Sequence, residues 1–406
     1  MKGLIAADHL PPRIFGAGTV SEAGRRKLAA LDGIRGLAVL AVMFSHFNRF
    51  LPADPWLIPA KSIFAYGGSG VDLFFVLSGF LITGILLQTR TAVNYFRSFY
   101  ARRVLRIFPL YYAALIAVFA ASTILPSLPN VPPPGQRWLY FAYLCNWIPV
   151  WTGSWPPNVV GHFWSLAVEE QFYIVWPFCV FLLSRKALLR LAIGLCAFAL
   201  LLRCYLVAQS GPTEAVMLGT FTRMDSLLFG AIAALMFAGD SGRRVLRYLT
   251  PIGASAALIT AAGLSITSWG KGIAASFGFL TTIGYTLVAI ACTALVLGAA
   301  LGDGTHSPVQ RIFRNAILCR VGKYSYGMYV YHVPLLGLCE LVIWNHVPAP
   351  VRGNGLAASA YLIFLTALTF GVAALSYEFF ERRILDAKRF FEPEFSPEDP
   401  IAAPES

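Results

Sequence analysis

The sequence contains little charge. Only 13% of its 406 residues are Asp, Glu, Lys or Arg, whereas a soluble protein of this length carries about 25%. Hydrophobic residues make up 57% of the chain, and the mean hydropathy is +0.65. Apolar runs of about 20 residues, the length that crosses a bilayer, recur along the whole chain. The composition therefore excludes a soluble globular protein and predicts an all-α polytopic membrane protein.

Several catalytic and binding motifs are also missing. The sequence has no P-loop, no G-x-G-x-x-G, no G-x-S-x-G and no H-E-x-x-H, which argues against ATPases, dinucleotide enzymes, serine hydrolases and zinc proteases. Its seven cysteines show no C-x-x-C spacing and its six histidines are scattered, so we predict neither a disulfide framework nor a metal site. Residues 1–27 lack an apolar run, and the first membrane helix is expected to serve as the targeting signal.

Hydropathy predicts about ten transmembrane helices plus one interfacial or re-entrant segment. We expect that segment at residues 138–151, which are aromatic but too few to span a bilayer. A basic tail (1–27) precedes the membrane region, and an acidic, proline-containing tail (386–406) that we expect to be disordered follows it. The expected spans are 31–50, 67–88, 107–125, 163–183, 188–208, 220–238, 248–268, 276–300, 324–344 and 356–379.

The positive charges are distributed unevenly between the loops. Under this topology the N-terminal tail, alternate loops and C-terminal tail contain 24 Lys and Arg residues, whereas the opposite loops contain 4. Cytoplasmic loops of membrane proteins are rich in Lys and Arg. The asymmetry predicts ten spans with both termini in the cytoplasm. It also explains the net charge of +12 as an adaptation to the lipid bilayer, without a nucleic-acid partner.

The first span contains two ionisable side chains, Arg35 and His46. Eleven residues of helix turn through ~1100° and rise ~16 Å, so both side chains share one face at different depths. Arg35 could alternatively extend to the lipid headgroups, and we expect the nearby Asp32 to be a helix N-cap. Because an ionisable group is expensive in hydrocarbon, we predict a functional role for His46.

A second pair of arginines, Arg103 and Arg106, stands just before the third span. Their spacing places both guanidinium groups on one helix face at the cytoplasmic boundary, where two forked donors suit a phosphate or pyrophosphate. The alternative is that they only anchor the helix at the membrane surface.

The fourth span begins with His162, Glu169 and Glu170. Seven residues correspond to two helical turns, so we expect His162 and Glu169 to share a face. A carboxylate inside an apolar span needs a partner such as Arg or His.

Four further polar residues lie within later apolar spans or at their ends. Asp72 begins the second span, and Arg223 and Asp225 are expected either to pair with each other or to complete the network of Glu169. His332 lies in a tyrosine-rich span, where a tyrosine hydroxyl or a backbone carbonyl could simply satisfy it.

Together these groups indicate a chemistry. A histidine in a water-poor cavity can take a proton from an alcohol, a carboxylate can orient its ring, and a basic cytoplasmic mouth can hold a phosphorylated donor. The set therefore favours group transfer from a cytoplasmic donor to a hydroxyl acceptor. A proton-coupled transporter uses similar intramembrane residues and is the alternative.

The chain resembles the acyltransferase-3 family of integral-membrane O-acyltransferases. The resemblance covers residues 28–385. The family's Arg-x(10)-His motif falls on Arg35 and His46, its Arg-x-x-Arg motif on Arg103 and Arg106, and its WSL-x-x-E segment ends at Glu169. The matching segments, in the family's order, are LDGIRGLAVLAVMFSHF, GVDLFFVLSGFLIT, FYARRVLRIFPLYY, HFWSLAVEEQFYIVWP, FTRMDSLLFGAIAA, GKYSYGMYVYHVPL and YEFFERR.

The resemblance implies an acyl-CoA donor, most often acetyl-CoA, and a hydroxyl acceptor on a sugar or glycan at the outer face of the bacterial plasma membrane. The acceptor class includes cell-surface polysaccharides, lipid-linked intermediates and glycosylated metabolites. Many members carry a fused extracytoplasmic esterase-like domain. We expect a stand-alone member here, with a separate extracytoplasmic protein as a candidate partner and no prediction of oligomeric state.

The expected roles divide the candidate residues into three groups. His46, as general base or transient acyl carrier, acts with Glu169 and Arg35 in catalysis. Arg103 and Arg106 bind the CoA phosphates. The expected substrate-binding residues are Asp72, His162, Arg223, Asp225 and His332.

Overall fold

The structure is a computed structural model that describes residues 22–124, 131–154, 158–211, 213–237, 242–268, 277–301 and 308–396. Within these ranges the chain forms helices and turns and no strand, which confirms the all-α prediction. Of the predicted tails, residues 1–21 and 397–406 lie outside the described residues.

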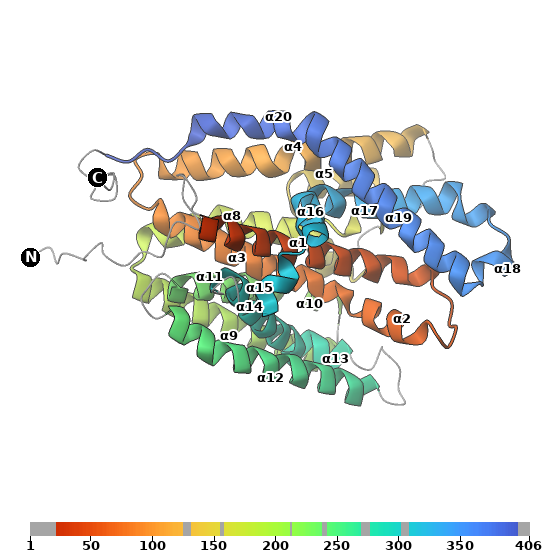
Figure 1. Cartoon of the computed structure of the whole chain (residues 1–406), viewed down its shortest axis with the longest axis horizontal. Helices are drawn as coiled ribbons and strands as arrows, with labels where there is room; N and C mark the ends of the chain where they lie inside the picture. Colours follow the sequence, from red (N-terminus) through yellow and green to blue (C-terminus); the bar gives the residue numbers. More distant parts are fainter. Residues whose placement is uncertain are drawn as a thin grey trace, which may run out of the picture.

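Nine helical segments of the described chain are long and apolar enough to cross a membrane. They run along one common direction and form a bundle (Figure 1), which confirms the prediction of a polytopic membrane protein. The principal helices of these segments are α1 (Glu22–Phe47), α3 (Gly70–Gln88), α4 (Tyr95–Ile124), α8 (Trp164–Leu182), α9 (Arg185–Ser210), α11 (Thr220–Phe237), α14 (Tyr285–Leu301), α17 (Ser325–Val342) and α19 (Gly355–Ser376).

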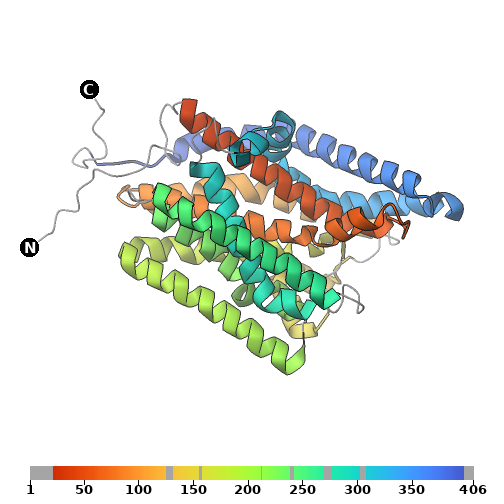
Figure 2. The same cartoon turned by 60° about the horizontal axis from the view of Figure 1, so that its bottom comes forward.

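The remaining expected span, 248–268, corresponds to α12 (Gly242–Ser268). Among the residues whose side chains the structure describes, its apolar stretch is Thr250–Gly263. The whole helix has 27 residues, about 40 Å, which is enough to cross the ~30 Å hydrocarbon layer. The helix packs against α14 and runs along the bundle beside it (Figure 2). The first described helix begins, and the C-terminal helices end, at the same end of the bundle (Figure 1). This arrangement fits an even number of crossings, with α12 as the tenth.

Helix α4 begins earlier than expected. We predicted a span from residue 107 onward, preceded by a basic stretch, but the helix starts at Tyr95 and contains 30 residues. Its length is about 45 Å, so about a third of it exceeds the hydrocarbon layer. Arg103 and Arg106 therefore lie inside a continuous helix, three residues apart on its surface.

Residues 138–151 do not form a spanning helix, as predicted. This region consists of α5 (Arg137–Phe141), η4 (Cys145–Trp147) and α6 (Ile148–Thr152). It is tied to α4 because the hydroxyl of Tyr111 donates to the carbonyl of Tyr140 at 2.7 Å. The segment thus folds against the bundle as a chain of short turns.

Two glycines allow α3 and α11 to cross in direct backbone contact. A Cβ atom at Gly79 would lie 1.8 Å from the Leu227 carbonyl oxygen, and one at Gly230 would lie 2.0 Å from the Val76 carbonyl oxygen. Small residues at helix crossings in membranes permit this close approach. The contact places the start of α3, with Asp72, against the start of α11, with Arg223.

The C-terminal segment corrects the expectation of disorder from residue 386. After α19 the chain continues through η8 (Tyr377–Glu381), α20 (Arg382–Leu385) and η9 (Asp386–Phe391), which run beside α4 (Figure 1). The carbonyl of Phe391, the last residue of η9, accepts from Ser98 Oγ at 2.8 Å. Residues beyond η9 are also bound, since Val93 N–H donates to the Glu394 carbonyl at 2.8 Å and Asn94 Nδ2 donates to the Glu392 carbonyl at 2.9 Å. The described part of the tail is therefore docked on the basic half of α4.

Candidate active site

A cavity of about 280 Å³ lies between α1, α3, α4, α8 and α17. Four charged residues that we predicted from three separate segments line it: Arg35, Arg103, Arg106 and Glu169. We call it the arginine cavity. Its remaining wall is largely apolar, with hydroxyl groups from Ser78, Tyr173, Ser165 and Tyr329.

Arg103 and Arg106 both face the arginine cavity, as their spacing predicted. The guanidinium of Arg103 lies 5.3 Å from the ring centre of Tyr173, a cation–π contact that orients it. Within the described residues, neither arginine has a carboxylate within 4 Å. Their forked donors are thus available to an anion.

Arg35 is paired within its own helix. Its guanidinium donates to the carboxylate of Asp32, three residues earlier. Asp32 is therefore not an N-cap, because α1 begins ten residues before it at Glu22. The ion pair holds the Arg35 side chain at the edge of the arginine cavity.

Glu169 does not lie against a histidine. It faces the arginine cavity, beside the Ser78 hydroxyl and within electrostatic reach of Arg103 and Arg106. The prediction that Glu169 and His162 share a helix face is wrong because α8 begins only at Trp164, and His162 lies in the turn before it. Glu170 is buried, and its Oε1 has no hydrogen-bond partner in the described structure.

Three histidines form a cluster on the other side of Tyr329. The ring centres of His46 and His332 are 5.0 Å apart, and those of His332 and His162 are 4.9 Å apart. The sequence indicated each histidine separately, but not that they meet. We call them the histidine cluster.

The hydrogen bonds of the histidine cluster fix which nitrogen of His46 is free. His332 Nδ1 lies 2.6 Å from the Tyr329 carbonyl and must donate to it, so His332 Nε2 is an acceptor. His46 Nδ1 lies 3.3 Å from that acceptor and 2.9 Å from the Val42 carbonyl. It therefore carries its own proton, and the lone pair of neutral His46 is on Nε2.

His46 also lines a second, larger cavity of about 850 Å³. We call it the histidine cavity. Asp72, Trp164, Arg223 and Tyr285 line the same space, and Val71 lines both this cavity and the arginine cavity. The two cavities thus approach each other on either side of Val71.

Asp72 and Arg223 form a buried ion pair in the histidine cavity. Arg223 donates to Asp72 Oδ1 at 2.8 Å, and Ser226 donates to the same oxygen at 2.7 Å. The guanidinium lies 3.6 Å from the ring centre of Tyr285. Asp72 Oδ2, Arg223 Nε and Arg223 Nη1 have no hydrogen-bond partner in the described structure, so the pair retains polar atoms for a ligand.

Asp225 has a different partner from the ones we expected. It accepts from Arg203 at 2.7 Å and from Thr286 at 3.0 Å, and it lines neither cavity. Arg203 is fully buried and also donates to the carbonyls of Thr222 and Thr282. This pair joins α9, α11 and the π-helical turn η6 (Leu280–Gly284) that leads into α14.

Sequence reasoning missed two contributors to the site. Tyr329 connects the arginine cavity with the histidine cluster: its hydroxyl contacts Ser165 and donates to the His162 carbonyl at 2.9 Å, while its carbonyl accepts from His332. Lys388, in η9, is half-buried and lies near enough to Arg102, Arg103 and Arg106 for their charges to repel it. The tyrosine-rich motif could have indicated the first, but the expectation of disorder concealed the second.

Comparison with known proteins places the chain in one family. A family described as an acyltransferase domain matches residues 28–378. The chain is 31% identical over 378 residues to the peptidoglycan O-acetyltransferase OatA of Listeria monocytogenes, covering 89% of this chain and 56% of that protein.

Two further relatives show the same pattern. A putative O-acetyltransferase of Staphylococcus aureus is 28% identical, with 88% of this chain and 57% of that protein covered. A putative peptidoglycan O-acetyltransferase of Bacillus subtilis, YrhL, is 29% identical, with 88% and 55% covered. The chain thus spans just over half the length of these curated relatives. No solved structure matches it.

The family match covers most of the chain, and the described structure supplies the apolar helices that such an enzyme requires. The chain therefore belongs to the acyltransferase family and is an integral-membrane acyltransferase.

Proposed function

We propose that the protein is an O-acetyltransferase that moves an acetyl group from acetyl-CoA to a hydroxyl of a cell-surface glycan. The observation that carries this proposal is the pair of cavities on either side of Val71, one with three arginines and the other with His46. A phosphorylated donor and a hydroxyl acceptor can each occupy one of them.

The arginine cavity suits the donor. Paired guanidinium groups bind phosphates in a forked geometry, and Arg103 and Arg106 lack carboxylate partners in the described chain. The volume of about 280 Å³ is at the lower end of small-molecule sites. Only the thioester arm of CoA would enter, and its phosphates would remain at the arginines.

His46 suits the role of general base. Its free Nε2 would take the proton of the acceptor hydroxyl, and the oxygen would attack the thioester carbonyl. The C–O bond then forms, the C–S bond breaks, and the CoA thiolate receives the proton from His46. His332 would act as a positioning residue through its contact with His46 Nδ1, at 3.3 Å. An acyl-histidine relay through the same Nε2 is the second form of this mechanism.

The histidine cavity suits a sugar. Its lining combines the faces of Trp164 and Tyr285 with the ion pair of Asp72 and Arg223, and a few placed polar groups among apolar ones are typical of small-molecule sites. Two of the relatives are named as acting on peptidoglycan. We therefore propose peptidoglycan, or a precursor sugar of it, as the acceptor.

The loop charges support the orientation of this site. The loops that we expect on one side contain 24 Lys and Arg residues, against 4 in the opposite loops, and basic loops face the cytoplasm. The start of α1 and the C-terminal helices lie at the same end of the bundle (Figure 1). We propose that the protein lies in the bacterial plasma membrane with the arginine cavity open to cytoplasmic acyl-CoA and the histidine cavity open to the outside.

The proposal is tested with the purified protein in liposomes. Labelled acetyl-CoA is supplied on one side and soluble peptidoglycan fragments on the other, and O-acetyl sugar is measured by mass spectrometry. We expect product only when both substrates are present. Binding of acetyl-CoA without product would reject peptidoglycan as the acceptor, whereas failure to bind acyl-CoA, with proton-coupled flux of solutes, would favour the transporter.

Lys388 provides a separate prediction for the donor site. We expect Lys388→Gln to raise the KM for acetyl-CoA about fivefold to tenfold with little change in kcat, because one cation near the CoA phosphates is lost. Lys388→Arg should retain most of the affinity.

Arg389→Gln is the matched control for this experiment. Arg389 is exposed and contacts Phe390 of its own segment, so its removal should leave the KM unchanged. If both variants raise the KM for acetyl-CoA equally, η9 contributes only its net positive charge, and Lys388 has no specific role at the donor site.

A further inference from the structure

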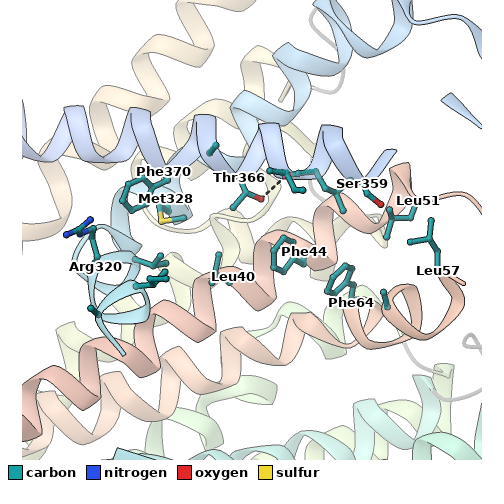
Figure 3. Close-up of a pocket in the computed structure, with 17 residues that line it drawn as sticks. Leu40, Phe44, Leu51, Leu57, Phe64, Arg320, Met328, Ser359, Thr366 and Phe370 are labelled. Carbon is teal, nitrogen blue, oxygen red and sulfur yellow. Dashed lines mark hydrogen bonds between the residues drawn. The ribbon is translucent and has the colours of Figure 1, made fainter. Parts of the chain in front are cut away.

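A third cavity, of about 780 Å³, opens on a different face of α1 and α17 from the two described above. It lies between these helices, α2 (Ile58–Ala65), α16 (Ala316–Lys323) and α19 (Figure 3). Leu40, Phe44, Met328 and Phe370 are typical of its lining. We call it the apolar groove, and neither of the proposed substrates uses it.

The apolar groove offers a ligand almost no unpaired hydrogen-bonding group. Its two hydroxyl groups are already satisfied within α19, where Ser359 donates to the Gly355 carbonyl at 2.8 Å and Thr366 donates to the Leu362 carbonyl at 2.8 Å. A sugar or nucleotide would lose its hydration in this groove without replacement. The lining therefore fits a hydrocarbon chain.

The part of the apolar groove that α19 lines is about as long as one leaflet of a bilayer is thick. From Ser359 to Phe370 this lining extends over twelve residues, about 16 Å, and half of the hydrocarbon layer is about 15 Å. Ile317 and Ile363 at its border are 73% and 71% exposed. The groove is thus open along the side of the bundle that faces lipid.

Arg320 is the one charged residue of this lining. It stands at one end of the groove, with Leu51 and Leu57 at the other (Figure 3). No carboxylate lies within 4 Å of it in the described chain. Its guanidinium can therefore bind an anion from outside the protein.

Arg320 lies on a helix that packs against the start of the apolar run of α1. Helix α16 packs directly on α1, because a Cβ atom at Gly322 would lie 1.8 Å from the Asp32 carbonyl oxygen. In the sequence, Asp32 closely follows Arg25, Arg26 and Lys27, the basic residues that precede the apolar run of α1. Arg320 thus lies near the level at which hydrocarbon gives way to headgroups.

We infer that the apolar groove is a binding site for an anionic phospholipid of the leaflet on that side. One acyl chain fills the groove along α19, and the phosphate contacts Arg320. The bound lipid covers the face of α1 that carries Leu40 and Phe44. The site is independent of the proposed transfer reaction, and its charge complementarity favours an anionic headgroup over a zwitterionic one.

The test uses native mass spectrometry of the full-length protein in detergent. Delipidated protein is titrated with phosphatidylglycerol or with phosphatidylcholine, and bound lipid is counted. We expect one retained phosphatidylglycerol with about fivefold preference over phosphatidylcholine, and loss of that preference in Arg320→Gln. Arg311→Gln is the control, since Arg311 is exposed in the neighbouring α15 (Pro308–Phe313) and lines no part of the groove.

A second variant tests the chain rather than the headgroup. Ala367→Phe places a large side chain in the groove and should reduce retention of both lipids, with folding checked by gel filtration. If that variant misfolds, quenching of tryptophan fluorescence by a brominated acyl chain in Phe370→Trp, compared with the wild type, gives the same information.

Three results would overturn the assignment: no lipid retained by the folded wild type, equal retention of both headgroups, or identical effects of Arg320→Gln and Arg311→Gln. Recovery of a lipid-linked glycan in place of phospholipid would also reject it.

Discussion

Substitution of His46 by alanine should lower the rate of acetyl transfer by about 10³-fold, because a general base contributes about 10²–10⁴ to the rate of such reactions. His46 is the member of the histidine cluster that lines the histidine cavity, and its free nitrogen is Nε2. The KM for acetyl-CoA should change little, since the arginines remain in place. Steady-state kinetics in liposomes measure both parameters.

Two other histidines provide the comparison. His346→Ala should leave transfer unchanged, because His346 is exposed in a turn and lines neither cavity. His332→Ala should lower kcat by a smaller factor and alter the pH profile, because His332 positions His46 without touching substrate. Activity of His46→Ala close to the wild type would remove His46 from the mechanism.

The same variant separates direct transfer from an acyl-histidine relay. In a relay, wild-type protein incubated with labelled acetyl-CoA and no acceptor should acquire one label that hydroxylamine removes, and His46→Ala should acquire none. In direct transfer, neither protein should acquire label. Both results are compatible with the proposed reaction and differ only in the order of its steps.

The double substitution Arg103→Ala/Arg106→Ala should raise the KM for acetyl-CoA about 100-fold or more. Each charged hydrogen bond lost costs about 1.5–3 kcal/mol, and both guanidinium groups face the arginine cavity without a carboxylate partner in the described chain. Calorimetric titration with acetyl-CoA should show the same loss of affinity.

Two controls test whether geometry or charge is responsible. Arg103→Lys keeps the charge but loses the forked donor, so it should restore only part of the affinity. Arg190→Ala removes an exposed arginine that lines neither cavity and should have no effect. Unchanged kinetics of the double variant would show that Arg103 and Arg106 only anchor α4 in the membrane.

The fold was largely predictable because hydropathy reports directly on burial in lipid. It located the spans and identified 138–151 as non-spanning, but it misplaced the start of α4. A basic, amphipathic extension of a membrane helix has no hydropathy signal to separate it from a loop. The ordered structure of residues 386–396 was also not predicted, because it depends on hydrogen bonds to α4 and the residues just before it, which the polar composition does not reveal.

The site was predictable residue by residue but not as an arrangement. Periodicity along one helix correctly placed Arg103 beside Arg106, since both lie on one regular element. Pairing between helices was wrong: Arg223 binds Asp72, and Asp225 binds Arg203. Which side chains pair depends on where the helices cross, as α3 and α11 do at Gly79 and Leu227. No local pattern in a single sequence encodes such a crossing.

Val71 stands where the two cavities approach each other. If only the acetyl group passes Val71, CoA and the peptidoglycan sugar remain in separate solvent compartments. A cell could then acetylate glycans on its outer surface with cytoplasmic acetyl-CoA without opening a path for ions. Sustained acetylation would leave the electrical potential across the membrane intact.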